Sequence, residues 1–272
     1  MLNSIKRAIK LNIAQHYWNQ KGSFKYYNHT VYFPKNSVIF KRAVQEGIYE
    51  HEIVSALIPL IKSNTEVFDI GANIGLMAIP MLVSNKAIKV ISVEASPNSL
   101  PFLKKTNMES ADRERWSIID KAVAEKEGKI NFNMAKSEDG AYDSISDTKR
   151  ISFKNTVEIE CTTIDSIWHA RNKPNISFIK SDIEGADLLA LKGGIECIKQ
   201  CKPSMLIEWN STNIKAFGLA NKDLFGFVQS MNYMLYTLPG LNKLTSLSDL
   251  ELQSNYTENF LLIPGENKSQ AQ

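Results

Sequence analysis

Hydrophobic and polar positions along the chain alternate between short apolar runs and longer amphipathic stretches. Most of the apolar runs end in a polar or charged residue, which is typical of buried strands that lead into surface loops. The five clearest runs are VFDI (67–70), KVISVE (89–94), WSIID (116–120), ISFIKSDI (176–183) and PSMLIEW (203–209). We expect each of them to form a strand.

Helical patterns follow four of these runs. They lie at residues 74–84, 96–110, 186–200 and 223–232. For the second, Ser96 is a suitable N-cap and Pro97 suits the first helical position. Strands that alternate with helices of this length require right-handed crossovers, so the sheet is mostly parallel and covered on both faces.

Later segments complete this pattern. Residues 233–238 (YMLYTL) and 258–264 (ENFLLIP) predict two further strands, while residues 129–133 and 157–161 alternate as in a small hairpin. The predicted fold is a doubly wound, mostly parallel, seven-stranded α/β sheet whose last strand is antiparallel. We assign residues 46–272 to this domain and residues 1–45 to an N-terminal arm.

Composition limits the class of protein and its compartment. With 272 residues, 43% of them hydrophobic, the chain can bury a core of its own. It has no apolar run of transmembrane length, and Lys6, Arg7 and Lys10 interrupt the apolar residues of the N-terminus. The three cysteines show no metal-ligand spacing. We expect a cytoplasmic protein.

The N-terminal arm is basic and aromatic. Residues 1–45 contain eight Lys or Arg residues and no Asp or Glu, and aromatic residues lie between the charges. Such a segment suits an anionic surface, and residues 1–18 predict a helix that attaches the protein to the inner face of a membrane. The alternative is an ordinary edge hairpin with a solvated basic face.

Candidate ligand-binding residues lie where the strands end. The first strand ends in Asp69, Gly71, Asn73 and Gly75, and glycines allow a backbone to bend sharply and approach a ligand. Glu94 ends the second strand, where a carboxylate can accept two ribose hydroxyls. A dinucleotide fold would have GxGxxG in this loop, whereas here Asn73 replaces the second glycine and Asp69 precedes the first. A ligand with an amino group and a ribose but no phosphate, such as S-adenosylmethionine, fits better.

These motifs resemble the FkbM family of S-adenosylmethionine-dependent O-methyltransferases, within the class I, Rossmann-like methyltransferases. The resemblance spans about residues 46–210, and Asp187 departs from it because the family usually has Glu there. The motifs that carry it are Gly47-Ile-Tyr49-Glu50, VFDIGANIG, ISVEASP, DKAVAEKEGKI, VEIECTTIDSI, FIKSDIEGADLLALKGG and PSMLIEWN.

The resemblance implies roles for individual residues. Asp69, Gly71, Asn73 and Gly75 would hold the methionine end of the cofactor, and Glu94 its ribose. Asp120 and Ala122, after the third strand, would contact the adenine. For Asp120, an exposed turn residue is an equal alternative.

The fourth strand carries candidate catalytic residues. Lys180, Asp182 and Glu184 occupy alternate positions and share a face, and buried charges are costly unless they are paired or face a cleft. Asp182 or Glu184 would align an acceptor hydroxyl and take its proton. A Lys180–Asp182 pair with a purely structural role is the alternative, and His51 is an alternative base.

A magnesium site is the other interpretation of this edge of the sheet. Asp182, Glu208 and Asn210 form an oxygen-rich set of the kind that catechol-type O-methyltransferases use for Mg²⁺. The metal ligands are otherwise unknown.

The resemblance implies methyl transfer from S-adenosylmethionine to a hydroxyl of a sugar, a glycan precursor or a related natural product. The expected acceptor is a saccharide or a lipid-linked glycan, and nucleic acid is disfavoured as a partner. The alternatives are an RNA 2′-hydroxyl methyltransferase and a cofactor-binding module without turnover.

Overall fold

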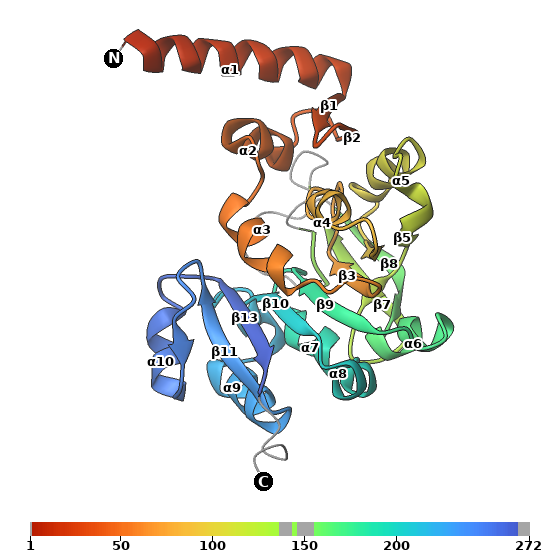
Figure 1. Ribbon diagram of the computed structural model, residues 1–272, viewed down its shortest axis with the longest axis vertical. Coiled ribbons are helices and arrows are strands. Elements are labelled where there is room, and N and C mark those ends of the chain that lie inside the picture. The colour runs from red at the N-terminus through yellow and green to blue at the C-terminus, as the bar shows by residue number, and fades with distance from the viewer. Residues whose placement is uncertain (1, 136–142, 146–154, 266–272) are drawn as a thin grey trace.

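The computed structural model describes residues 2–135, 143–145 and 155–265, and for residues 2–10 it describes the backbone alone. Figure 1 shows a central sheet with helices on both faces and a long N-terminal helix that extends beyond the body of the protein. Among the helices of the described ranges, none has the length and apolar character that crossing a bilayer requires.

The main sheet has eight strands in the order β12-β11-β13-β10-β9-β3-β4-β5. Their bounds are β3 Glu66–Ile70, β4 Lys89–Val93, β5 Trp116–Ile119, β9 Ile176–Ser181, β10 Ser204–Glu208, β11 Tyr233–Leu238, β12 Lys243–Leu244 and β13 Asn259–Pro264.

The strand directions confirm the predicted doubly wound sheet. The pairs β10–β9, β9–β3, β3–β4 and β4–β5 are parallel, whereas β13 runs antiparallel to both β10 and β11. Seven strands with the last one reversed were predicted, and the eighth, β12, adds a two-residue edge beside β11. The carboxyl ends of β3, β4, β9 and β10 therefore meet at one edge of the sheet, where ligands bind in such folds.

Two hydrophobic cores cover the two faces of the sheet. Alternation along each strand divides its residues between them, so that Val67 belongs to one core while Phe68 belongs to the other. The flanking helices are α3 His51–Leu57, α4 Ala78–Ser84, α5 Leu100–Met108, α6 Ile164–Ala170, α7 Asp187–Lys192, α8 Ile195–Cys201, α9 Asn221–Ser230 and α10 Leu247–Gln253, with short 3₁₀ turns η1 Ile58–Leu60, η2 Arg113–Arg115 and η4 Ile214–Phe217.

Three helices differ from their predicted bounds. Helix α4 begins at Ala78 and not at residue 74, because Asn73 and Gly75 have φ of 50° and 92°, outside the helical region. The pattern at 186–200 forms two helices, α7 and α8, separated by Gly193 and Gly194. A side chain at Gly193 would place its Cβ 2.3 Å from the carbonyl oxygen of Ala124, so a close backbone approach occurs at this break.

The predicted start of the helix after β4 was wrong. Helix α5 begins at Leu100 with Ser99 as its N-cap residue and Pro101 in its first turn, and not with Ser96 and Pro97. The hydroxyl of Ser96 accepts a hydrogen bond from the Asn98 N–H at 3.0 Å. Ser96 thus forms a local turn, a geometry that competes with helix initiation.

A smaller three-stranded sheet follows β5. Its strands are β6 Ala122–Val123, β7 Gly128–Met134 and β8 Asn155–Thr162, in the order β6-β8-β7. Strands β7 and β8 pair antiparallel, as their alternating pattern predicted.

The N-terminal segment packs onto the first core. It consists of α1 Leu2–Lys21, a hairpin of β1 Ser23–Tyr26 and β2 His29–Tyr32, and α2 Val38–Glu46. Phe24, Tyr26, Phe33 and Phe40 are all buried in the core that also holds α4 and one face of the main sheet. The separation of residues 1–45 from residues 46–272 as folding units stays a prediction.

Stability measurements on Phe33 test how the N-terminal segment folds. Its ring stacks on Phe40 with centroids 3.8 Å apart, and both side chains are 1% exposed. We expect Phe33→Ala to lower the free energy of unfolding by about 3–5 kcal/mol in urea denaturation. The urea unfolding curve of this variant should still show a single transition. The control Tyr17→Ala, at a residue that is 61% exposed, should change the free energy of unfolding by less than about 0.5 kcal/mol. A separate early transition would show instead that the segment unfolds on its own.

Candidate active site

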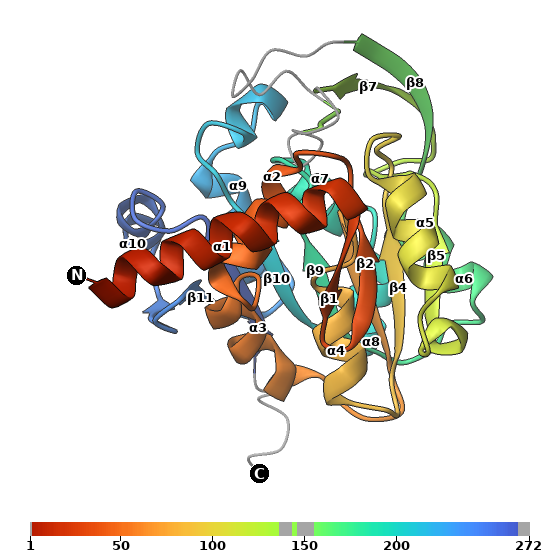
Figure 2. The same ribbon diagram turned by 90° about the horizontal axis from the view of Figure 1, so that it is seen from above.

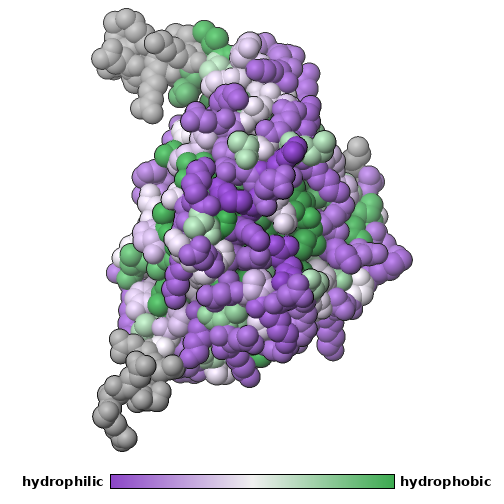
Figure 3. Space-filling view, turned by 45° about the vertical axis from the view of Figure 1, so that its right-hand side comes forward, coloured by the Kyte–Doolittle hydropathy of each residue, from purple (hydrophilic) through white to green (hydrophobic). Residues whose placement is uncertain are grey.

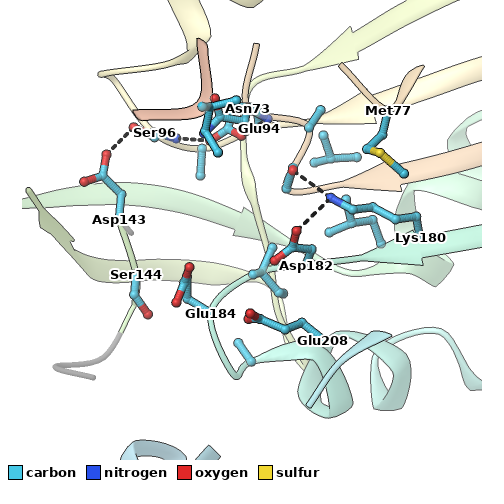
Figure 4. Close-up of a pocket in the computed structure, with 18 of the residues that line it drawn as sticks. Asn73, Met77, Glu94, Ser96, Asp143, Ser144, Lys180, Asp182, Glu184 and Glu208 are labelled. Carbon is cyan, nitrogen blue, oxygen red and sulfur yellow. Dashed lines mark hydrogen bonds and ion pairs between the residues drawn. The ribbon is translucent and has the colours of Figure 1, made fainter. Parts of the chain in front are cut away.

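A cavity of about 320 Å³ lies at the carboxyl ends of β3, β4, β9 and β10. This volume is within the range of roughly 300–1,000 Å³ that small-molecule sites occupy. Helix α2, the loop before α3 and the segment after β7 supply further walls. Figure 4 shows acidic side chains from several of these elements around the cavity. The surface view in Figure 3 shows a face of the molecule that is largely hydrophilic.

The loop after β3 brings its backbone to the cavity. Gly71 has a φ of 74°, and a Cβ there would lie 2.0 Å from the carbonyl oxygen of Asp182. Gly71 and Asn73 line the cavity as predicted. Gly75 does not line it: a Cβ at Gly75 would lie 2.8 Å from the Trp116 ring. Gly75 therefore lets the loop pack against β5, and its effect on the site is indirect.

Glu94 is held in the wall of the cavity by two backbone donors. The N–H of Asn73 donates to Oε2 at 2.6 Å, and the N–H of Ser96 donates to Oε1 at 2.7 Å. Burial raises the pKa of this carboxyl to about 7, although the two backbone hydrogen bonds oppose the shift. The carboxylate is thus fixed in orientation, with lone pairs left for a ligand.

Asp69 does not line the cavity. It is linked to the cavity wall through Lys180, which does line it. The side chain of Asp69 is fully buried. Its Oδ1 lies 3.7 Å from Lys180 Nζ, which also lies 3.4 Å from Asp182 Oδ2 and donates to the Gly71 carbonyl at 3.1 Å. Burial opposes the charge of Lys180, yet the carboxylates of Asp182 and Asp69 raise its pKa. The lysine stays protonated and joins the loops after β3 and β9.

The two residues predicted to contact the adenine separate in the structure. Ala122 lines the cavity, whereas Asp120 does not. The carboxylate of Asp120 is about half exposed and forms an ion pair with Lys104 at 2.7 Å. Asp120 thus matches the exposed turn residue that was its alternative.

The candidate catalytic carboxylates, Asp182 and Glu184, both line the cavity. The side chain of Asp182 is 38% exposed and pairs with Lys180. Glu184 is more deeply buried and accepts a hydrogen bond from the Asn213 amide at 2.8 Å. Its φ of 56° is unusual for a glutamate, and such conformations concentrate at functional sites. Figure 4 shows Glu184 and Glu208 on the same side of the cavity as Asp182.

Asp187, where the family usually has Glu, holds the turn that carries these carboxylates. Its Oδ1 accepts from the Ser181 hydroxyl at 2.7 Å and from the Ile183 N–H at 3.3 Å, while Oδ2 accepts from the Gly185 N–H at 3.3 Å. Complete burial raises its pKa to about 7. The shorter side chain still reaches across the whole turn.

The predicted magnesium ligands do not come together. Glu208 lines the cavity, but Asn210 does not. The Asn210 side-chain oxygen accepts from the N–H groups of Thr212 and Asn213 at 2.8 and 3.1 Å, and its amide donates to Glu258. Within residues 2–135, 143–145 and 155–265, no group of three His, Cys, Asp or Glu side chains is placed to hold a metal ion.

The chain before β3 supplies cavity-lining residues that the strand-end argument missed. Arg42, Tyr49 and Glu50 line the cavity, and Glu50 has a φ of 50°. Arg42 lies 3.6 Å from Glu50, whose pKa is raised by burial and by Asp182. The signal was the family-like Gly47-Ile-Tyr49-Glu50 motif. His51, considered as an alternative base, is exposed and does not line the cavity.

Two further segments reach the cavity without a sequence signal. Asp143 accepts hydrogen bonds from the Ala135 N–H at 2.6 Å and the Asn98 amide at 3.0 Å, and its carboxylate contacts the Ser96 hydroxyl. Glu258, just before β13, and Asn259, its first residue, also line the cavity. These residues follow no glycine turn and end no parallel strand, so the sequence pattern did not indicate them.

Comparisons with known proteins agree with this geometry. A sequence profile of the methyltransferase FkbM domain matches residues 69–235, more than half of the chain. Ribosomal RNA small subunit methyltransferase G of Mycoplasmopsis pulmonis is 38% identical over 65 residues, which are 24% of this chain and 28% of that protein.

Among solved structures, the methyltransferase FkbM from Methylobacillus flagellatus is similar to this chain with a TM-score of 0.51 and 16% identity. The alignment covers 92% of this chain and 58% of that one, so this chain spans less than two thirds of both proteins.

A glycine substitution tests the close approach of the two strand-end loops. Alanine at Gly71 would overlap the Asp182 backbone, whereas alanine at Gly218, which has a φ of 69°, would have no atom within 4 Å. We expect Gly218→Ala to cost about 1–2 kcal/mol for its backbone conformation alone. Gly71→Ala should cost clearly more in urea denaturation and weaken S-adenosylhomocysteine binding by more than about tenfold in calorimetry. Equal costs would contradict the observed contact.

Proposed function

This chain belongs to the FkbM methyltransferase family, and we propose that it transfers a methyl group from S-adenosylmethionine to a hydroxyl oxygen of a saccharide or lipid-linked glycan. The observation that carries the proposal is the cavity at the strand ends, with Glu94 oriented by two backbone N–H groups on one side and Asp182 and Glu184 on another. The cavity thus has separate places for a nucleoside and for a reacting hydroxyl.

The lining of the cavity fits the proposed cofactor. When bound, S-adenosylmethionine supplies an electrophilic methyl group on a sulfonium. Glu94 can accept hydrogen bonds from a ribose diol, and the backbone at Gly71 and Asn73 can approach the methionine end closely. Carboxylates outnumber cations among the described lining residues, which favours a ligand with cationic sulfonium and ammonium groups over one with a pyrophosphate.

The proposed proton acceptor is Asp182. An alcohol must lie in line with the methyl group and lose its proton as the new bond forms. Asp182 is open to the cavity, and Lys180 holds its carboxylate in place. Glu184 is the second candidate and accepts one hydrogen bond from Asn213. Glu50, whose pKa is raised by burial and by the charge of Asp182, is the third.

The acidic lining of the cavity favours a neutral or cationic acceptor over an anionic one. Glu50, Asp182, Glu184, Glu208 and Glu258 are among the described lining residues, while the lining cations Arg42, Lys121 and Lys180 are engaged with carboxylates. Like charges about 4 Å apart repel by ~4 kcal/mol at an effective dielectric constant of ~20. Neutral hydroxyl groups, or an ammonium, suit this cavity better than a phosphodiester.

The RNA alternative has one observation in its favour, which is the similarity of a 65-residue stretch to a ribosomal RNA methyltransferase. That stretch is 24% of the chain. Because the acidic lining opposes phosphates, we rank RNA 2′-hydroxyl methylation second. A binding module without turnover would not need several carboxylates in the cavity wall, and we rank it third.

The decisive experiment supplies S-adenosylmethionine with a panel of neutral glycolipids, amino-sugar glycans, sugar nucleotides and RNA, and detects methyl gain by mass spectrometry. Methylation of a saccharide supports the proposal, and methylation of RNA alone would replace it with the second candidate. S-adenosylhomocysteine should raise the melting temperature, whereas NAD should not, because only a ligand of the folded state stabilises it. A stable S-adenosylhomocysteine complex without methylation of any member would favour the binding module.

The pH dependence of cofactor binding tests the role of Glu94. Its carboxyl has a pKa of about 7 in the folded protein, so it gains charge as the pH rises from 6 to 8. If the charged form accepts the ribose hydroxyls, the affinity for S-adenosylhomocysteine should rise about fivefold to tenfold over this interval. Calorimetry at three pH values measures this change.

The matched variants are Glu94→Gln and Asp120→Asn. Glu94→Gln should bind more weakly and lose the pH dependence between 6 and 8. Asp120→Asn removes a carboxylate outside the cavity and should keep both the affinity and its pH dependence. An unchanged pH profile in Glu94→Gln would remove the ribose assignment.

The turnover of carboxamide variants tests the proton acceptor. On an acceptor found by the panel, Asp182→Asn should lower kcat by about 10²–10⁴ while cofactor affinity changes little, because a positioned base contributes that much. Glu184→Gln and Glu50→Gln are the comparison variants. If either loses more activity than Asp182→Asn, the base assignment moves to that residue.

A further inference from the structure

Helix α1 has one side packed against the protein and an opposite side exposed. Leu11 and Trp18 pack against the core, and the Asn19 amide donates to Asn36 at 2.9 Å. A quarter of a turn or more away, Ile13 and Tyr17 are 65% and 61% exposed. Figures 1 and 2 both show α1 extending past the elements that it contacts.

The sequence before Ile13 carries more apolar residues, Leu2, Ile5 and Ile9, at intervals of three and four, which is the spacing of one face of a helix. Lys6, Arg7 and Lys10 stand between the positions of this apolar row in the sequence. Figure 3 shows hydrophobic residues at the surface beside the grey N-terminal atoms.

The charge around this row has a single sign. Residues 1–45 contain eight basic residues and no acidic residue. An apolar row flanked by lysines matches a helix that lies in the plane of a membrane surface, with its apolar side chains among the acyl chains and its lysines at anionic head groups. A second copy of the chain would bring the same lysines together and is disfavoured by their repulsion.

We propose that the outward side of α1, centred on Ile13 and Tyr17, docks on an anionic lipid surface. This proposal does not depend on the methyl-transfer reaction. It does bring the cavity near the lipid, because α1 contacts α2 and α2 lines the cavity with Val38, Ile39 and Arg42.

Co-sedimentation of the full chain with vesicles tests the proposal. The vesicles contain phosphatidylglycerol and phosphatidylcholine, or phosphatidylcholine alone. The protein should bind the anionic vesicles and release at high salt, because surface charge attraction is screened. Ile13→Asp and Tyr17→Asp should each weaken binding by roughly tenfold or more, since each removes apolar burial and adds repulsion.

The chain offers a matched control pair. Leu252 and Tyr256 are also four positions apart and are 56% and 79% exposed, but Asp249, Glu251 and Glu258 lie near them in the sequence. Leu252→Asp and Tyr256→Asp should leave vesicle binding unchanged. Because all four positions are exposed, these variants should fold, and their melting temperatures check this.

Three results would overturn the proposal. They are no binding of the unaltered chain to anionic vesicles, equal binding by the Ile13→Asp and Tyr17→Asp variants, and an equal loss in the control pair. Analytical ultracentrifugation of the same variants tests whether a second copy of the chain binds this side of α1 instead. If the unaltered chain is a dimer that Ile13→Asp dissociates, and it does not bind vesicles, the row is an interface between copies.

Discussion

Lys180 carries the buried charge on which the geometry of the site depends. Its ammonium contacts the carboxylates of Asp69 and Asp182 and the carbonyl oxygen of Gly71, so one cation joins the ends of β3 and β9. Removing one partner of such a group leaves an uncompensated charge, which typically costs 3–5 kcal/mol. Here the contacts of Lys180 offset the cost of its burial, and the lysine holds together the two loops that carry the proposed cofactor-binding residues and the candidate base.

The other features of the site follow from that junction. The Asp182 N–H donates to the Ile70 carbonyl at 3.1 Å, and the loops approach so closely that Gly71 has no room for a Cβ. Asp187 then satisfies the donors of the turn after β9, which lets Glu184 adopt its left-handed backbone conformation. A series of polar contacts thus runs from the buried strand ends to the cavity wall. Each contact restricts the conformations open to the neighbouring side chain or loop.

Much of the fold could be predicted because buried parallel strands have a strong local signal. The apolar runs that end in Asp69, Glu94, Asp182 and Glu208 predicted the sheet and the edge at which the cavity lies, since the carboxyl ends of parallel strands converge. The start of α5 was wrong because Ser96 has the chemistry of an N-cap but makes its hydrogen bonds in a turn beside Glu94. A cap pattern contains no information about such competing tertiary contacts.

Predicting the cavity lining from strand ends was incomplete for a different reason. The pattern places a residue at an edge of the sheet, but the direction of its side chain depends on packing. Asp69 therefore turned out to lie behind the cavity and Asp120 outside it, although both follow strands as predicted. Conversely, Glu50 and Asp143 reach the cavity from segments distant in sequence. A single sequence cannot indicate contacts of that kind unless a motif, such as Tyr49-Glu50, marks them.

The N-terminal elements connect the two proposals. They are not an appendage to the sheet, because Phe33 and Phe40 lie in its core and Arg42 lies in the cavity wall. The basic charge is nevertheless concentrated there, while the cavity itself is rich in carboxylates. A protein whose acceptor carries both an anionic lipid anchor and a neutral glycan would need these two electrostatic environments side by side. The basic helix would attract the anionic lipid, and the acidic cavity, which repels phosphates, would receive the neutral sugar.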